Sequence, residues 1–385
     1  MNKKDFILEN IEAIKDNLIE LNDKIGNNPE LGFKEYKASR WLTEYLARHD
    51  FSIKKGVGGL ETAFKAEYHY NNIGPKIAFL CEYDALPNIG HGCGHNMIGV
   101  ISLGAAVALS QLDNLTGSIE VIGCPGEEVG GGKVTLVKAG IFDDIDVAMM
   151  VHPANKNRAY STSLAIEAIK FIYHGQTAHA ASTPEKGVNA LDGVIQLFNG
   201  INAMREHLKD DVRIHGIISK GGESPNVVPE LAEAKFYFRA REKEYLEEIV
   251  QKGKNIAEGA AQMTGCEVEW SNFENSNDNL IPNENLVSTF EDNLRLVGIN
   301  DIAKPEDSFG STDMGNVSQV VPAIHPYIKI GDNLTGHTIE FRNATMSNEG
   351  HQALIKAASA LALTGFELYS NQDLLREVKD EFENR

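Results

Sequence analysis

Three short apolar segments of this chain run directly into clusters of polar residues. They lie at residues 77–81, 119–124 and 147–151, and helical patterns separate them. Alternation of short apolar strands with helices is typical of a mostly parallel sheet with helices on both faces. The carboxyl ends of such strands meet at one edge, where ligands and catalytic groups collect. We therefore predict an α/β fold, with a mixed, mostly parallel sheet and polar clusters gathered at one edge.

The order of the elements changes in the middle of the chain. Residues 165–276 read as strand, helix, two strands, helix and strand, which is the order of a ferredoxin-like α+β unit. Helix–strand alternation then resumes and includes a strand predicted at 323–330. We therefore predict a discontinuous, metal-binding catalytic domain (1–164 and 277–385) with an inserted ferredoxin-like lid and dimerisation domain at 165–276.

Charge and composition exclude some partners. The formal net charge of −19 argues against nucleic acid or an anionic membrane surface, because both attract basic proteins. No apolar run reaches the roughly 18 residues that a membrane span needs, and the start of the chain reads as an amphipathic helix rather than a signal peptide. The four cysteines are too scattered for a disulfide framework. We expect a cytoplasmic protein with reduced thiols.

Potential metal ligands follow each of the three apolar segments. Cys93 and His95 follow the first, Glu127 and Glu128 the second, and His152 ends the third. Thiolate and imidazole donors suit zinc or another late first-row divalent metal. A further imidazole follows the last predicted strand. The candidate ligands are therefore Cys93, His95, Glu128, His152 and His337.

Five ligands exceed what one tetrahedral zinc ion with an open position uses. Two divalent metal ions, zinc or manganese, about 3.5–4 Å apart and bridged by a water, fit the set better. Such a pair generates hydroxide near neutral pH, and Glu127 would move its proton to a leaving amine. Asp84 is close enough along the chain to orient a ligating imidazole.

The chain contains, in this order, the motifs NPELGFKEYKAS, YDALPNIGHGCGHN, PGEEVGGGK, VHP, GQTAHAASTPEKGVNALD, SPNVVPE, FRAR, STDMG and GHT. On these motifs the chain resembles the aminoacylase and carboxypeptidase-G superfamily of dinuclear metallopeptidases. The resemblance covers nearly the whole chain and lies in the branch of indole-acetyl-amino-acid, N-acyl-amino-acid and p-aminobenzoyl-glutamate hydrolases. The subgroup of p-aminobenzoyl-glutamate hydrolases and β-alanyl-lysine-type dipeptidases is most similar.

The resemblance implies roles for individual residues. Glu127 matches the general base, and the five candidate ligands match the family's metal ligands. In the inserted domain, which forms the dimer interface in this family, His179 matches the residue that reaches the substrate carbonyl across a homodimer. Asn226 and Arg239 match the pair that binds the substrate carboxylate.

Two positions depart from the family pattern. Glu82 stands where many relatives carry a histidine, which puts a ligand from that position in doubt. Asn96 replaces the aspartate that commonly follows the Cys-Gly-His motif. Whether both metal sites fill is therefore open.

The sequence predicts a metal-dependent amidohydrolase that cleaves an amide bond next to a free carboxylate. The expected substrates are N-acyl amino acids, dipeptides or p-aminobenzoyl-glutamate. One alternative is a non-catalytic or regulatory binding subunit on the same scaffold. A second is a cysteine hydrolase that uses Cys93, although that reading leaves Glu127, Glu128 and His337 without a role.

Overall fold

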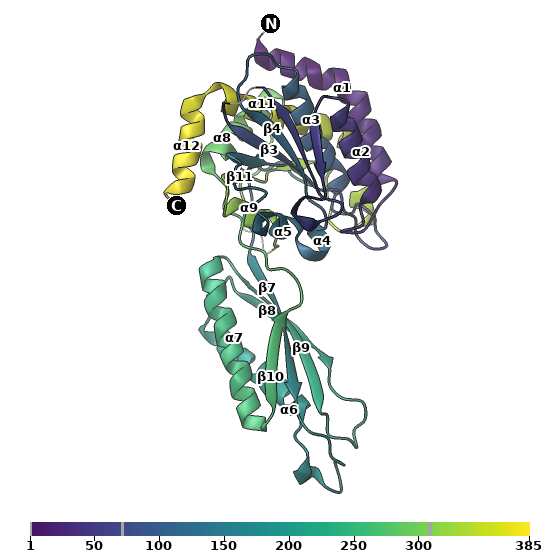
Figure 1. Ribbon diagram of the computed structural model, residues 1–385, viewed down its shortest axis with the longest axis vertical. Helices are drawn as coiled ribbons and strands as arrows, with labels where there is room; N and C mark the ends of the chain where they lie inside the picture. Colours follow the sequence, from purple (N-terminus) through teal and green to yellow (C-terminus); the bar gives the residue numbers. More distant parts are fainter. Residues whose placement is uncertain (1, 71–72, 307–309) are drawn as a thin grey trace. The chain divides into compact units, whose positions relative to one another are not determined.

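The computed structural model describes residues 2–70, 73–306 and 310–385. Its contacts divide the chain into two compact units, residues 1–162 with 280–385 (unit 1) and residues 163–279 (unit 2) (Figure 1). Within the described ranges, no helix is both long and apolar enough to span a membrane.

Unit 1 is built on a six-stranded sheet in the order β1-β2-β4-β3-β5-β11. The β1–β2 and β2–β4 pairs are antiparallel, and the other neighbours are parallel. The strands are β1 (Ser52–Lys55), β2 (Phe64–His69), β3 (Lys76–Cys81), β4 (Ser118–Gly123), β5 (Val147–Met149) and β11 (Ala323–Ile324), with a separate pair β6 (His152–Ala154) and β12 (Tyr327–Lys329).

Helices cover both faces of this sheet, as predicted. Alternate residues of β3 point to opposite faces, so Phe79 joins the larger hydrophobic core and Leu80 joins the smaller one. The helices of unit 1 are α1 (Lys3–Gly26), α2 (Tyr36–Ala47), α3 (His95–Ser110), α4 (Glu127–Gly130), α5 (Gly132–Lys138), α8 (Glu284–Leu296), α9 (Met314–Ser318), α10 (Ile339–Ala344), α11 (Asn348–Ser370) and α12 (Gln372–Glu383), with a short 3-10 helix at Val57–Gly59.

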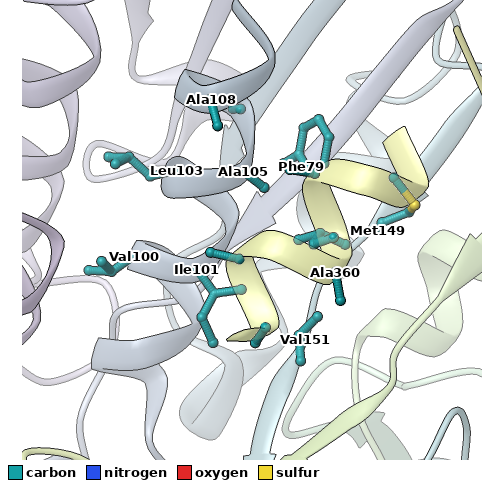
Figure 2. Packing of buried hydrophobic residues seen from close by; sticks show 14 of the residues in the cluster. Phe79, Val100, Ile101, Leu103, Ala105, Ala108, Met149, Val151 and Ala360 are labelled. Atoms are coloured by element: carbon teal, nitrogen blue, oxygen red, sulfur yellow. The ribbon is translucent and has the colours of Figure 1, made fainter. Parts of the chain in front are cut away.

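Small side chains let α3 pack deeply against its neighbours. Every residue of α3 is buried, and in Figure 2 Ile101 and Ala105 lie beside the part of α11 that carries Ala360. A side chain at Gly99 would place its Cβ 2.8 Å from the Glu82 carbonyl oxygen. The small residue at this position therefore brings the start of α3 against the end of β3.

Unit 2 is a four-stranded antiparallel sheet in the order β10-β7-β9-β8, with α6 and α7 packed on one core. The predicted order of strands and helices is confirmed. The elements are β7 (Ala165–His174), α6 (Ala190–Met204), β8 (Arg213–Lys220), β9 (Leu231–Ala240), α7 (Lys243–Thr264) and β10 (Glu267–Asn272), with 3-10 helices at Pro184–Lys186 and Arg205–His207.

One predicted element is wrong in detail. The single strand expected at 323–330 is two strands, β11 and β12, which pair with β5 and β6 respectively. His325 and Pro326 lie between them, and proline has no N–H to donate to a sheet ladder. The His152 N–H instead donates to the Pro326 carbonyl at 2.9 Å. The segments that follow β5 and β11 therefore leave the main sheet side by side.

Candidate metal centre

The carboxyl ends of three adjacent parallel strands, β4, β3 and β5, carry the predicted polar clusters to one edge of the unit 1 sheet. The loop after β3 leads to Cys93 and His95, and the loop after β4 leads to Glu127 and Glu128. His152 begins β6 directly after β5. The structure therefore brings all of these side chains, together with His337, into one cluster.

Gly94 fixes the geometry of the Cys-Gly-His motif. It precedes α3 with φ of 83°, in the left-handed region that favours glycine. A Cβ at this position would lie 2.3 Å from Cγ of Pro153. The backbone turn at Gly94 therefore presents Cys93 and His95 toward the same cluster.

Cys93 is shared by two groups of donor atoms. Its Sγ, with donors from His95 and His152, forms a group whose atoms lie within 4.8 Å of one another. The same limit holds for Cys93 with Glu128 and His337. Burial opposes ionisation of the Cys93 thiol, yet the His152 and His95 imidazoles lower its pKa to about 6. A thiolate that belongs to two three-donor groups offers a soft ligand to a cation held by either group.

Asp84 contacts both His95 and the loop that carries Glu127 and Glu128, which we call the glutamate loop. Its Oδ1 lies 2.7 Å from His95 Nδ1, and its Oδ2 accepts a hydrogen bond from the Glu128 N–H at 3.0 Å. A carboxylate at Nδ1 places the ring proton there and leaves Nε2 free to bind a metal. His95 Nε2 is buried, lacks a hydrogen-bond partner among the described residues and lies 3.9 Å from Glu128 Oε1.

His337 completes the second donor group from a strained backbone. Its φ is 63°, which is uncommon for a residue other than glycine, and its N–H donates to the Gly92 carbonyl at 2.8 Å. Its Nε2 lies 3.4 Å from Glu128 Oε1. Hydrogen bonding to Cys93 and Glu128 raises the pKa of His337 to about 10.

The donor set fits divalent metal ions. The buried His95 Nε2 has no hydrogen-bond partner within the described part of the chain, and unpaired buried polar atoms are costly. The neighbouring carboxylates and thiol raise the pKa of His95 well above its usual value even though burial opposes this. The site therefore stabilises positive charge, and thiolate, imidazole and carboxylate donors are those that zinc binds.

Glu127 belongs to a third three-donor group, which it forms with His95 and Glu128 and which lacks Cys93. It is partly buried, and one of its carboxylate oxygens lies within 4.8 Å of donors from His95 and Glu128. Burial raises the pKa of Glu127 well above its usual value, and the Glu82 and Asp313 carboxylates add to the rise. A carboxylate with a raised pKa is suited to acid–base work near neutral pH.

A buried ion-pair network near Glu127 was not predicted from the sequence. Lys133 is fully buried; its Nζ contacts Glu82 Oε1 and lies 2.5 Å from Asp313 Oδ1. Glu82 Oε2 is in turn 3.3 Å from His95 Nε2. Although burial opposes it, the Lys133 ammonium holds the pKa of Glu82 down to about 2. Glu82 stands where many relatives carry a histidine, and the Lys133 ammonium balances its negative charge.

A buried histidine, His325, adjoins the centre as well. Its ring centroid lies 5.4 Å from that of His152, and Tyr327 contacts both rings. The signal in the sequence is the repeated His-Pro pair at 152–153 and 325–326, which follows two strands that pair in parallel.

The three predicted substrate residues belong to unit 2. His179 and Asn226 lie in adjoining loops, where the Ala180 N–H donates to the Asn226 carbonyl at 3.0 Å. Arg239 is near the other end of β9 and pairs with Ile166 at the start of β7. Because Asn226 precedes a strand of 10 residues and Arg239 is next to last in it, roughly 30 Å of extended chain separates them.

Two backbone N–H groups favour one tautomer of the His179 ring. The N–H groups of Ala181 and Ser182 each point to His179 Nδ1 at 3.2 Å. A ring nitrogen that accepts hydrogen bonds carries no proton, so the neutral imidazole has its proton on Nε2. The exposed His179 side chain therefore offers an N–H donor to a ligand.

Comparison with known proteins agrees with this fold and donor set. Residues 78–363 match the model of peptidase family M20/M25/M40. The chain belongs to this family, which confirms the resemblance seen in the sequence, and it is a metallopeptidase of the M20 type.

Individual relatives cover nearly the full chain. The Xaa-Arg dipeptidase of Mus musculus is 37% identical over 97% of this chain and 90% of its own length. One of the p-aminobenzoyl-glutamate hydrolase subunits of Escherichia coli (strain K12) is 30% identical over 98% of this chain and 94% of its own. The crystal structure of a Bacillus subtilis protein described as a dinuclear metal binding peptidase from the M20 family has a TM-score of 0.69 at 19% identity, over 92% of this chain and 99% of that one.

Proposed function

We propose that this chain is a two-metal amidohydrolase that releases an amino acid from a dipeptide or an N-acyl amino acid. The observation that carries the proposal is the pair of three-donor groups that share Cys93, with Glu127 beside them. The proposed ligands are Cys93, His95, Glu128, His152 and His337, and the proposed ions are zinc or manganese. The Bacillus subtilis structure, described as dinuclear metal binding, supports two ions.

When bound there, divalent metals would polarise the scissile carbonyl and lower the pKa of water. Glu127 would take a proton from the attacking water and deliver it to the leaving nitrogen. Its raised pKa favours holding that proton between the two transfers. Asp84 would keep His95 in the orientation that leaves Nε2 free.

The substrate would be held by its free carboxylate. The names of the Mus musculus and Escherichia coli relatives, a dipeptidase and a p-aminobenzoyl-glutamate hydrolase, support an amide next to an amino acid. The Arg239 guanidinium is suited to the carboxylate because its fork can bind both oxygens. The Nε2–H of His179 would donate to the carbonyl oxygen as negative charge develops on it.

A homodimer would reconcile the positions of these substrate residues. Asn226 and Arg239 lie toward opposite ends of β9, so one carboxylate could meet both only if they came from different copies. The edge strand β8 pairs with β9 alone among the described strands, and Ile217 and Ile218 on it are exposed. Exposed apolar edge strands readily pair with another chain. We therefore propose that β8 contributes to the dimer contact.

A metal-dependent amine-release screen tests the proposal. Purified protein would be incubated with N-acetyl amino acids, dipeptides including Xaa-Arg, and p-aminobenzoyl-glutamate, each with and without zinc or manganese. Chelator-sensitive release from at least one substrate class is expected. A protein that binds metal but releases no amine from any of them would favour a non-catalytic binding role.

The contact between Cys93 and His152 gives a specific reason to test a cysteine hydrolase as well. Sγ lies 3.5 Å from Nε2, and the pKa of the thiol is lowered to about 6. A cysteine nucleophile would work in excess chelator and be inactivated by thiol alkylation. Loss of activity in chelator, with recovery on addition of metal, would eliminate that mechanism.

Replacing Cys93 with alanine should reduce metal content more than replacing either His152 or His337. The reason is that Cys93 belongs to both donor groups, whereas each histidine belongs to one. Equilibrium dialysis followed by elemental analysis measures the ions retained per chain. Equal losses in the three variants would contradict a shared ligand.

A further inference from the structure

Two buried carboxylates accept hydrogen bonds from the backbone N–H groups on either side of Glu127. The Gly126 N–H donates to Glu35 Oε1 at 2.8 Å, and the Glu128 N–H donates to Asp84 Oδ2 at 3.0 Å. The loop that presents Glu127 is therefore held at the residue before it and at the residue after it. Asp84 also contacts His95, but Glu35 comes from a distant part of the sequence and has no part in the donor cluster.

Glu35 is fully enclosed and its hydrogen bonds are directed. None of its surface is exposed, Oε1 also accepts from the Phe33 N–H at 2.8 Å, and Oε2 accepts from Thr62 Oγ1 at 2.8 Å. The Thr62 carbonyl in turn accepts from the Tyr83 hydroxyl at 2.8 Å. A buried carboxylate is costly unless hydrogen bonds compensate it. Here the compensating donors come from Phe33, from Thr62 and, through Gly126, from the glutamate loop itself.

The backbone next to Glu35 shapes the same loop. Phe33 has φ of 62°, which is uncommon for an aromatic residue. Its ring lies over Gly126, where a Cβ would be 2.7 Å from two ring atoms. Gly126 has φ of 68°, so the loop turns sharply under the ring and leads directly into Glu127. Residues 33–35 therefore cover the turn and bond to it.

We infer that Glu35 is a positioning residue that fixes the direction of the general base by holding the Gly126 N–H. The inference rests on the proposed role of Glu127. Strain at Phe33 and burial at Glu35 are both unfavourable, and the pair is consistent with a structure that supports a reactive group. Displacement of a catalytic group by about 1 Å can reduce turnover by about 100-fold.

Glu30 provides a matched control at the same helix. Its Oε2 accepts from the Lys37 and Ala38 N–H groups at 2.8 and 3.1 Å, at the start of α2. Glu30→Ala therefore removes a carboxylate whose hydrogen bonds go to α2, whereas one oxygen of Glu35 accepts from the glutamate loop. Glu35→Ala removes the support of the loop, and Glu35→Gln keeps an oxygen that can accept from Gly126.

Steady-state kinetics with metal analysis tests the role in turnover. Glu35→Ala is expected to lower kcat by about 100-fold, with KM changed little and metal content retained. Glu35→Gln should recover most of that loss, and Glu30→Ala should keep kcat near that of the unmodified protein. A kcat for Glu35→Ala that falls no further than that of Glu30→Ala would overturn the inference.

Hydrogen–deuterium exchange tests the support of the loop without any substrate. Exchange in a peptide covering residues 124–131 should accelerate in Glu35→Ala but not in Glu30→Ala or Glu35→Gln. Unchanged exchange in Glu35→Ala would show that the loop does not depend on Glu35. If the unmodified protein hydrolyses nothing while exchange responds as expected, the proposed function fails and the structural support stands.

Discussion

Replacing Glu127 with glutamine is expected to lower kcat by about 1,000-fold or more while leaving the metal content unchanged. Glutamine has nearly the same shape but cannot accept and return a proton. Glu127 does not belong to the two donor groups that share Cys93; it forms a third group with His95 and Glu128. Its raised pKa, caused by burial and by the Glu82 and Asp313 carboxylates, fits a group that carries a proton between water and a leaving amine.

Glu128→Gln is the matched control for this prediction. The two glutamates are adjacent, but Glu128 Oε1 faces His337 Nε2 at 3.4 Å and His95 Nε2 at 3.9 Å. The Glu128→Gln variant should bind less metal and should lose activity for that reason. Metal content from elemental analysis and kcat, measured for both variants, distinguish the proposed general base from the proposed metal ligand. Metal loss in Glu127→Gln with retention in Glu128→Gln would mean that the two roles are reversed.

Lys133→Met is expected to destabilise the protein by about 3–5 kcal/mol. The Lys133 ammonium is fully buried between Glu82 and Asp313, and the Lys133 N–H also donates to Asp313 Oδ2 at 2.9 Å. Methionine fills a similar volume but removes the ammonium that the two buried carboxylates share, and leaves the His95 imidazole as the cation beside Glu82. Urea unfolding at neutral pH measures the free energy of unfolding.

The control for Lys133→Met is a variant in which the whole network is neutral. Combining Lys133→Met with Glu82→Gln and Asp313→Asn removes the unpaired charges and should recover much of the lost stability, because neutral replacements of buried ion networks are often well tolerated. A single Lys133→Met variant within about 1 kcal/mol of the unmodified protein would contradict a charge-balancing role, because breaking a buried pair normally costs several times more.

The cluster at the sheet edge was predictable because strand ends at one edge of a parallel sheet meet regardless of their distance in sequence. Cys93, Glu128 and His152 come from three such strand ends. The order of elements in unit 2 was predictable from the same alternation of patterns. These features depend on periodicity and on general rules of sheet topology.

Other features depend on pairings that no local pattern reports. Lys133 follows a glycine-rich turn, where a lysine would ordinarily be exposed, and only the fold places Glu82 and Asp313 around it. Glu35 meets Gly126 across 91 positions of sequence. A strand at residues 230–239 was predicted between Asn226 and Arg239, but only the observed pairing of β9 shows that the two residues lie toward its opposite ends.

Titration of metal-free protein with zinc or manganese, while amine release from an Xaa-Arg dipeptide is followed, tests the central claim most directly. We predict no hydrolysis without metal, and activity that rises with bound metal up to two ions per chain. Hydrolysis at full rate in excess chelator would contradict the metal mechanism. Full loading without amine release from this or any other dipeptide or N-acyl amino acid would contradict the proposed activity.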